Sequence, residues 1–323
     1  MKFSQNPSYL SVEPKLEMEF GKFGGMFVPD PFSPALEALA EKVGKTFASE
    51  EFLKNREAVL EALGTEVPAL EEVGEIKNAS VYKLCAPVFE LILSGYLALA
   101  KTLELTPSFA GLNAARLETF VKAAAALDLK AYIALSKELS QDAALVSKLE
   151  KAGHKVENKK CVELFDDAVL YAFQYFISNI NNSLYVPDEA NSGPYPLPSL
   201  TAAFMAGMTK VVKKVMDEDM KGAVDAILAP AFPGSGALAA FKACDNCDAR
   251  LISVEAAFEV ERDDCYCGVY TKVVKVGKEE RILCPELAAL WENREVDRIY
   301  AEDFTTALAA LDIEGKVLVV EDC

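Results

Sequence analysis

Apolar runs alternate along the chain with amphipathic segments, and their lengths predict strands and helices in turn. The most apolar run of helical length is Val88–Lys101, where apolar residues fall at nearly every position. A helix of this composition is buried on most of its sides. Val81 and Tyr82 indicate the end of a short buried strand, and Pro87 suits a helix start because its missing N–H would be unsatisfied there anyway. The pattern therefore predicts a buried strand that leads directly into a buried central helix.

The remaining segments predict an α/β arrangement around this pair. Helices are expected over residues 35–43, 49–63, 115–127, 141–152, 161–179 and 199–216. Strands are expected over residues 130–135, 154–156, 224–230 and 250–255. Such alternation predicts parallel sheets with crossover helices. The 323 residues are enough for two domains of this kind that share a cleft, or for one large domain.

Charge and cysteine content narrow the classes of partner and location. The formal net charge is −17, which makes nucleic acid and anionic membrane surfaces poor partners. The sequence has no N-terminal basic-then-apolar signal and no apolar run of membrane length. Eight cysteines in a chain without such a signal predict reduced thiols and a cytoplasmic location.

Four of the cysteines form the one cluster of soft metal ligands in the sequence. Cys244 and Cys247 make a C-x-x-C pair, and Cys265 and Cys267 make a C-x-C pair. The chain between the pairs is long enough for them to meet, so four thiolates could hold a structural zinc ion or an iron–sulfur cluster. A redox dithiol at the C-x-x-C pair and thiols without any such role are the alternatives. The single histidine, His154, excludes a histidine-rich metal site.

The glycines and prolines of the N-terminal segment form a specific pattern. Residues 20–43 read FGKFGGMFVPDPFSPALEALAEKV, a glycine- and proline-rich turn followed by a helix. This segment resembles the N-terminal segment of the tryptophan synthase β subunit. Weaker matches to the same family follow at 193–198, 253–255, 298–305 and 317–320. The resemblance therefore spans most of the chain.

The resemblance implies a fold, a domain division and partners. The fold it implies is the two-domain α/β fold of the fold-type-II pyridoxal-phosphate enzymes, with parallel sheets flanked by helices. It assigns residues 1–52 and 88–192 to an N-terminal domain and residues 53–87 and 193–323 to a C-terminal domain. It also implies a homodimer, and a related α or β subunit as a protein partner.

Residues that the family uses for catalysis are replaced at the matching positions. The Schiff-base lysine of the family aligns with Phe89, and its acid-base glutamate falls near Ala110. Pro233 removes one donor N–H from the family's phosphate loop. The cofactor-binding candidates that remain in this loop are Gly234, Ser235, Gly236 and Ala237. The family's serine partner for the ring nitrogen has no counterpart before Cys323, so the resemblance implies a truncated C-terminus.

These replacements predict a catalytically degenerate relative, a pseudoenzyme that acts as a binding, scaffold or regulatory subunit. Catalytic residues act as a unit, so losing several leaves little of the original chemistry. Pyridoxal phosphate is therefore not expected as a cofactor. One alternative is a pyridoxal-phosphate-type lyase or other enzyme with altered chemistry in the same cleft, with Lys83 as the Schiff base. The other is a protein that binds zinc or an iron–sulfur cluster through its cysteines.

Apolar side chains predict how the cleft is filled and where a partner could bind. Phe89, Phe109, Leu112 and Phe232 predict a cleft narrower and more apolar than a cofactor site. The arm before residue 20 and the aromatic helix 161–179 carry more apolar surface than one buried stripe requires, which predicts a homodimer interface. The alternative is that both are covered within the monomer.

Overall fold

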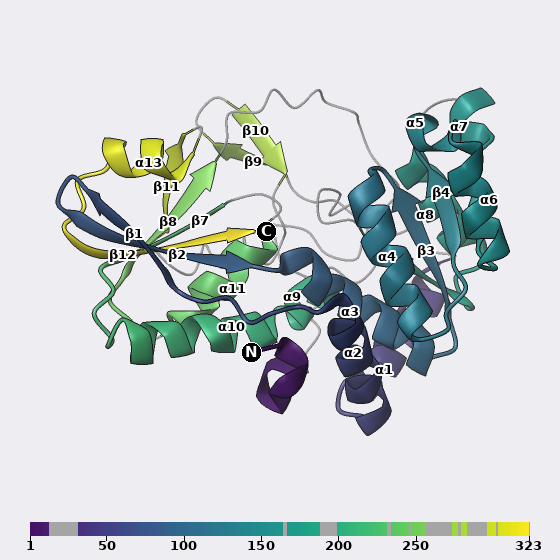
Figure 1. Ribbon diagram of the computed structural model, residues 1–323, viewed down its shortest axis with the longest axis horizontal. Helices are drawn as coiled ribbons and strands as arrows, with labels where there is room; N and C mark the ends of the chain where they lie inside the picture. The colour runs from purple at the N-terminus through teal and green to yellow at the C-terminus, as the bar shows by residue number, and fades with distance from the viewer. Residues whose placement is uncertain are drawn as a thin grey trace.

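Within the described residues, a six-stranded and a four-stranded β-sheet, each flanked by helices, form most of the fold (Figure 1). This computed structural model describes residues 1–12, 32–163, 167–187, 199–230, 234–245, 247–255, 273–276, 279–282, 296–301 and 303–322. The expected α/β class, with parallel sheets flanked by helices, is confirmed. The domain boundaries given above stay a prediction.

The larger sheet has six strands in the order β1-β2-β12-β7-β8-β11. They are β1 (Glu71–Ile76), β2 (Ala79–Ala86), β7 (Ala226–Pro230), β8 (Arg250–Glu255), β11 (Val296–Tyr300) and β12 (Gly315–Asp322). All neighbours pair in parallel except β1, which forms an antiparallel hairpin with β2. Strand β12 therefore lies in the middle of the sheet, between β2 and β7, and the carboxyl ends of the three strands share one edge.

The smaller sheet has four parallel strands in the order β5-β4-β3-β6. They are β3 (Thr106–Gly111), β4 (Tyr132–Leu135), β5 (Lys155–Glu157) and β6 (Ser183–Val186). A separate antiparallel hairpin consists of β9 (Val273–Val276) and β10 (Glu279–Ile282).

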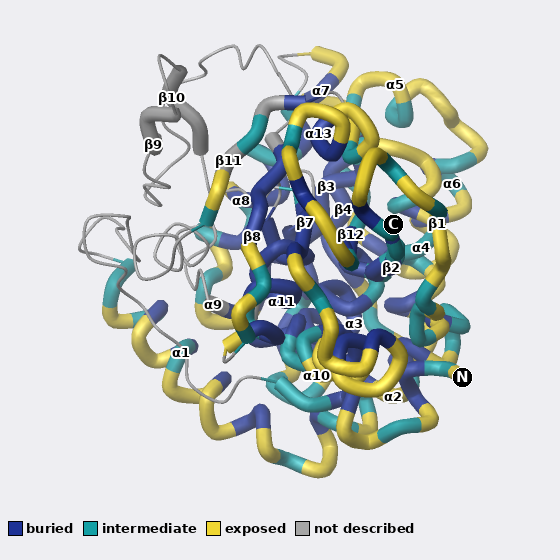
Figure 2. Tube along the Cα trace, turned by 90° about the vertical axis from the view of Figure 1, so that its left-hand side faces the viewer, coloured by how far each residue is buried: buried dark blue, intermediate teal, exposed yellow. Residues whose placement is uncertain are grey.

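Helix α3 (Val88–Thr102) lies between the two sheets and is buried almost throughout. The other helices are α1 (Ser33–Thr46), α2 (Glu50–Leu63), α4 (Ala114–Ala126), α5 (Lys137–Ser140), α6 (Ala143–Lys151), α7 (Lys160–Glu163), α8 (Ala168–Ser178), α9 (Ser199–Phe204), α10 (Ala206–Lys214), α11 (Ser235–Ala243) and α13 (Phe304–Ala310). Figure 2 shows the buried positions concentrated along α3, α11 and the central strands. A β-carbon on Gly95 of α3 would overlap the ring of Phe204, so glycine allows α9 to pack closely here.

The two faces of the larger sheet pack in different cores. Leu318 and Val320 belong to the main core together with Ala237 and Ala240 of α11. Val317 and Val319 of the same strand belong to a second core with Ala307 and Leu308 of α13. Because side chains alternate along a strand, Glu321 follows the α13 face and Asp322 follows the α11 face.

Two expected helices differ from the structure. The segment 161–179 forms α7 and then α8, and the Asp167 carboxylate begins α8 by accepting a hydrogen bond from the Leu170 N–H at 2.8 Å. The segment 199–216 forms α9 and α10, after which Val215–Asp219 makes a π-helical turn. A helix-capping group within an apolar run, such as Asp167, interrupts the regular pattern without removing its periodicity.

The N-terminal residues pack against their own chain. Short 3₁₀ turns over Phe3–Gln5 and Pro7–Leu10 bury Phe3, Tyr9 and Leu10. In α8 the rings of Tyr171, Phe173 and Phe176 are also buried. For these described residues the structure matches the alternative in which the arm and the aromatic helix are covered within the monomer.

Arg56 of α2 ties this arm to the central helices. Its side chain is completely buried. The guanidinium donates to the carbonyl oxygens of Leu10 at 2.9 Å, Ser11 at 3.1 Å and Phe204 at 2.6 Å, and to Ser94 Oγ at 3.2 Å. These acceptors replace the water that the cation loses, so Arg56 joins the arm, α3 and α9 around one charge.

Candidate functional site

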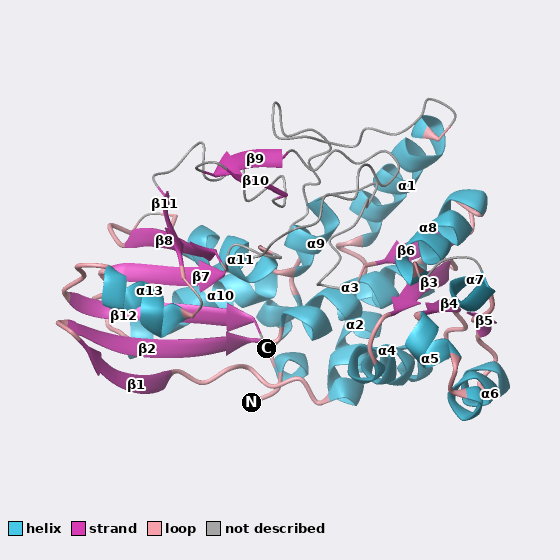
Figure 3. Ribbon diagram, turned by 90° about the horizontal axis from the view of Figure 1, so that it is seen from above, coloured by secondary structure: helices cyan, strands magenta, loops and turns pink. Residues whose placement is uncertain are grey.

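The carboxyl edge of β2, β12 and β7 lies beside the starts of α3 and α11, which hold Phe89 and the cofactor-binding candidates Gly234–Ala237. Strand β2 leads through Pro87 into α3, and β7 precedes the start of α11 at Gly234. The last residue of β12, Asp322, pairs with Ala86 at the end of β2. In Figure 3 the arrowheads of these strands point toward the helices that separate the two sheets. In parallel sheets this edge is the usual place for ligands.

The start of α3 carries the aromatic ring of Phe89. Phe89, in the first turn, is 5% exposed. The guanidinium of Arg116 lies over its ring, 4.8 Å from the centroid. Arg116 is in the first turn of α4, where its N–H donates to the side chain of Asn113 at 2.9 Å. This cation–π contact joins the first turns of two helices at the position where the resemblance predicts a replaced lysine.

The other residues that were expected to fill the cleft are Phe109, Leu112 and Phe232. Phe109 is fully buried and stacks on Phe120 of α4, with ring centroids 4.2 Å apart, so it belongs to the core beside the smaller sheet. Leu112 is half-buried and packs against that core. Phe232 lies outside the described residues.

Helix α11 starts without a side-chain cap. Its N-cap residue, Gly234, is left-handed with φ 95°, and Ser235, Gly236 and Ala237 are buried. A β-carbon on Gly236 would overlap Oδ1 of Asp322. Both carboxylate oxygens of Asp322 are buried. The strand that ends the described chain thus places a carboxylate against the first turn of this helix, a contact that the sequence analysis missed.

Lys83 lies on the other face of the sheet. It forms an ion pair with Glu321, its neighbour on β12. Both side chains are partly exposed, Lys83 by 34% and Glu321 by 28%. Strand alternation places the pair on the α13 face, with Val81 and Val319, whereas α11 packs on the opposite face. The structure therefore does not bring Lys83 together with Gly234–Ala237.

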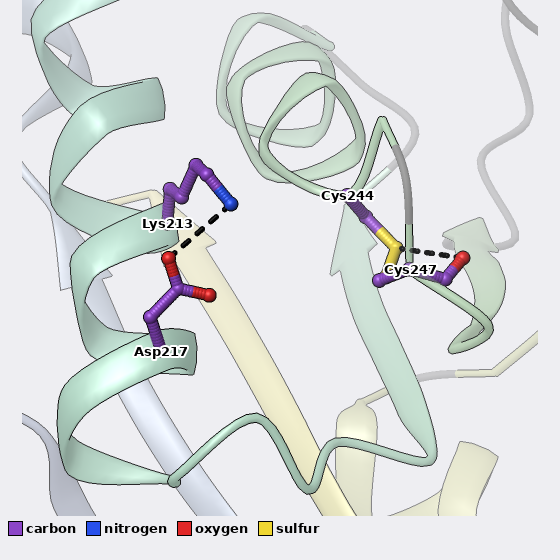
Figure 4. The surroundings of a disulfide bond; sticks show 4 residues. All are labelled: Lys213, Asp217, Cys244 and Cys247. Carbon is purple, nitrogen blue, oxygen red and sulfur yellow. Dashed lines mark hydrogen bonds and ion pairs between the residues drawn. A yellow bond between two sulfur atoms is a disulfide. The ribbon is translucent and has the colours of Figure 1, made fainter.

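Three of the described cysteines differ from the expected reduced thiols. Cys244 and Cys247 form a disulfide, with their Cα atoms 5.0 Å apart (Figure 4). Cys85 is also disulfide-bonded. A disulfide sulfur is not a thiolate ligand, so this pair does not present the half-site that a zinc or iron–sulfur centre requires. Cys265 and Cys267 lie outside the described residues, and within the described ranges no group of three or more potential metal ligands comes together.

His154 has a structural role. It is buried, and its Nδ1 accepts a hydrogen bond from the Ala131 N–H at 3.2 Å. Burial lowers the pKa of its imidazole, and the nearby charge of Lys130 lowers it further. The neutral ring therefore holds the start of β4 against the turn before β5.

Two surface hollows lie away from these residues. One, of about 600 Å³, is open and lies between the N-terminal turns and α2. The other, of about 280 Å³, lies where α1 meets the turns before β3 and β6. Neither is lined by a residue of the candidate site. None of the helices in the described part of the chain is both long and apolar enough to cross a bilayer.

The chain is similar in sequence to curated tryptophan synthase β chains. No family model matches the chain. The tryptophan synthase β chain of Fusobacterium nucleatum subsp. nucleatum is 30% identical over 256 residues, which cover 74% of this chain and 64% of that relative. The β chain of Staphylococcus aureus is 26% identical over 263 residues, covering 76% and 64%. The chain therefore spans less than two thirds of the length of the curated relatives it matches.

A solved structure was also found in the comparisons. It is the O-acetylserine dependent cystathionine β-synthase from Helicobacter pylori, at 14% sequence identity and a TM-score of 0.47. The match covers 81% of this chain and 93% of that one.

Proposed function

Because this chain is related by sequence to the tryptophan synthase β chains, we propose that it is a non-catalytic counterpart that acts by binding, as a scaffold or regulatory subunit. The observation that carries the proposal is the buried Phe89 ring at the start of α3, with the Arg116 guanidinium 4.8 Å from its centroid. A phenyl ring has no lone pair with which to form an imine, and Arg116 covers the ring that replaces the amine.

The residues at the carboxyl edge of the larger sheet do not fit pyridoxal phosphate. That cofactor needs an amine nucleophile and a seat for its phosphate. Lys83 is paired with Glu321 on the opposite face of the sheet. The first turn of α11 is already in close contact with the side chain of Asp322, whose Oδ1 would overlap a β-carbon at Gly236. We therefore derive no catalytic step through this cofactor.

A binding role requires a stable scaffold, and the packing supports one. The main core runs from the N-terminal turns through α3 to both sheets. Partners in this proposal are a second copy of the chain and a related α or β subunit, and the location is the cytoplasm. A protein that loses several catalytic residues can keep its fold and its binding surfaces, because a fold does not depend on the site that it carries.

The cofactor half of the proposal is tested on the purified full chain. After incubation with pyridoxal phosphate we expect no imine absorption at roughly 400–430 nm and no borohydride-stable adduct. We also expect no tryptophan synthesis. The matched control is Lys83→Met: an adduct present in the unaltered chain and absent from this variant would overturn the proposal and favour an enzyme that uses Lys83.

The association half is tested by light scattering at micromolar concentration. A homodimer is expected, with an interface beyond roughly 1,000 Å² in total. Mixing with the β chain of Fusobacterium nucleatum tests the related-subunit partner directly, because a mixed species has a mass of its own. Monomer mass both alone and in the mixture would contradict a scaffold built on these partners.

A further inference from the structure

The disulfide between Cys244 and Cys247 joins the end of α11 to the segment that leads into β8. Cys244 is the C-cap residue of α11, and β8 begins at Arg250, soon after Cys247. The stabilisation that a disulfide gives grows with the length of the loop that it closes. The loop here is that of a C-x-x-C pair, so the fold gains little from this bond.

The backbone holds the two cysteines together independently of the disulfide. The Cys247 N–H donates to the carbonyl oxygen of Cys244 at 3.3 Å, and the two Cα atoms lie 5.0 Å apart, which is the geometry of a β-turn. The Cys244 N–H in turn donates to the carbonyl oxygen of Phe241 in α11 at 3.1 Å. None of these hydrogen bonds uses a sulfur atom. The turn therefore keeps two thiols close enough to form the disulfide again after it has opened.

The two sulfur atoms differ in how easily a reagent reaches them. Cys244 is 1% exposed and belongs to the main core, whereas Cys247 is half-buried and packs against that core. The rate at which a thiol attacks a disulfide depends on access to the sulfur that it attacks. An external thiol therefore reacts at Cys247, and Cys244 is the leaving group.

We propose that the Cys244–Cys247 pair is a thiol–disulfide exchange site, at which Cys247 is the sulfur attacked and a dithiol is the reductant. Disulfides in the cytoplasm are usually catalytic or redox-sensing, so this inference rests on the cytoplasmic location given under the proposed function. It goes beyond that function because it assigns the chain a reaction of its own, away from the start of α3.

The exchange balances in two steps. First, a thiolate of the reductant bonds to Cys247 Sγ, the bond between the two cysteines breaks, and Cys244 leaves and takes up a proton. Its Sγ lies 3.7 Å from the carbonyl oxygen of Cys247, which can accept a hydrogen bond from the new thiol (Figure 4). Second, the other thiolate of the reductant attacks the reductant sulfur that is bonded to Cys247. Cys247 is released as a thiol, the reductant becomes a cyclic disulfide, and two electrons and two protons have passed to the chain.

The turn decides which class of reductant completes the reaction. After the first step Cys244 still lies close to Cys247, so it can attack Cys247 Sγ and expel the reductant. A monothiol needs a second molecule to compete with this return. The second thiol of a dithiol is part of the same molecule, and its effective concentration is correspondingly high. The geometry therefore selects a dithiol over a monothiol.

The first test compares two uncharged reductants on the unaltered full chain. At equal thiol concentration, dithiothreitol should open the Cys244–Cys247 disulfide at least about tenfold more completely than 2-mercaptoethanol. Alkylation of the opened thiols and peptide mapping assign the reaction to these two cysteines and separate it from Cys85. Equal opening by both reductants, or no opening of the folded chain by dithiothreitol, would overturn the proposal. This measurement requires no variant.

Single-cysteine variants test which sulfur reacts. The reduced chain is incubated with 2-hydroxyethyl disulfide, the oxidised form of 2-mercaptoethanol. The unaltered chain should re-form its disulfide and keep no adduct, whereas Cys244→Ala should keep one on Cys247, because no neighbouring thiol expels it. In Cys247→Ala, Cys244 should react at least about tenfold more slowly than Cys247 does, because a buried thiol reacts only after local opening.

Cys161 provides the matched control for burial. It is also 1% exposed, so it should stay unmodified over the time in which Cys247 of Cys244→Ala reacts. Equal rates at Cys244 and Cys247 would overturn the assignment of the attacked sulfur. A lasting adduct on Cys247 of the unaltered chain would show that the turn does not keep Cys244 within reach.

The two proposals fail separately. An imine at Lys83 would end the non-catalytic function and leave the exchange rates at Cys247 unchanged, because Lys83 is paired with Glu321 on the sheet and not with these cysteines. Cysteines that do not exchange, in a chain that forms no imine, would end the proposal on the disulfide and leave the non-catalytic function standing.

Discussion

Charged side chains have different kinds of partner around Arg56 and at the carboxyl edge of the larger sheet. Arg56 is completely buried, and the acceptors of its hydrogen bonds are three carbonyl oxygens and one hydroxyl rather than a carboxylate. At the sheet edge, Lys83 pairs with Glu321, Arg116 lies over Phe89, and Asp322 lies against α11.

The difference separates a structural charge from the charges at the candidate site. Around Arg56 a single cation binds acceptors from three distant segments, namely carbonyl oxygens of the arm and of α9 and a hydroxyl of α3, so it is a feature of the fold. At the sheet edge each charged group contacts another part of the same chain. A catalytic site keeps such groups available to a ligand. The comparison therefore predicts large stability effects around Arg56 and small ones at the edge.

The largest effect is expected for Arg56→Met. The change leaves the carbonyl oxygens of Leu10 and Phe204 buried without their donor. We expect a loss of about 3–5 kcal/mol in the free energy of unfolding, measured by urea denaturation. Lys54→Met, an exposed position on the same helix, is the control and should change stability by less than about 0.5 kcal/mol. Similar losses in the two variants would contradict the structural role of Arg56.

The next effect concerns the approach of the N-terminal turns to α10. A β-carbon on Gly207 would overlap the carbonyl oxygen of Tyr9. Gly207→Ala should therefore cost about 1–3 kcal/mol, because backbone cannot move aside as a flexible side chain can. Gly44→Ala in α1, where a β-carbon would meet nothing within 4 Å, should instead stabilise by up to about 1 kcal/mol. If Gly207→Ala changed the free energy of unfolding as little as Gly44→Ala, the N-terminal arm would not pack against α10 at this position.

Periodicity in the sequence predicted the helices and strands that lie in the core. It did not predict edge strands, whose place depends on how the strands are ordered in the sheet. The apolar run of α3 and the strand before it were predicted because nearly every position is buried. Strand β1 was not predicted, because it is an edge strand with the sequence EEVGEI and mostly exposed side chains. Strand β3 includes Pro107, which weakens a strand pattern.

The candidate site was predicted less completely than the fold. Phe89 at the start of α3 was predicted from the resemblance. Its partner Arg116 was not, because the contact joins two helices that are separate in sequence. Asp322 was overlooked for the same reason: alternation gives the face of a strand, but only the position of β12 between β2 and β7 puts that face against α11.

The pH dependence of stability tests His154, a buried titratable group away from both regions. Burial lowers the pKa of its imidazole in the folded chain, so the unfolded chain binds a proton more readily. Stability should be fully present above the unfolded pKa of about 6.5 and should fall as pH drops toward the folded value, by at most about 1.4 kcal/mol per pH unit. The His154→Gln variant should lose this dependence between pH 6.5 and the lowered pKa. An unchanged profile would assign the dependence to other groups.

The smallest effect is expected at the ion pair between Lys83 and Glu321. Because both side chains are partly exposed, Glu321→Gln should cost only about 0.2–1 kcal/mol in stability. The informative readout is chemical: the change frees the Lys83 amine without moving it from the α13 face of the sheet. If orientation rather than pairing keeps Lys83 from acting, Glu321→Gln incubated with pyridoxal phosphate and borohydride will still give no adduct at Lys83. An adduct in this variant alone would mean that the ion pair with Glu321 is what prevents Lys83 from reacting with pyridoxal phosphate. The lack of reactivity at the sheet edge would then depend on the Glu321 carboxylate and not on the face of the sheet to which Lys83 points.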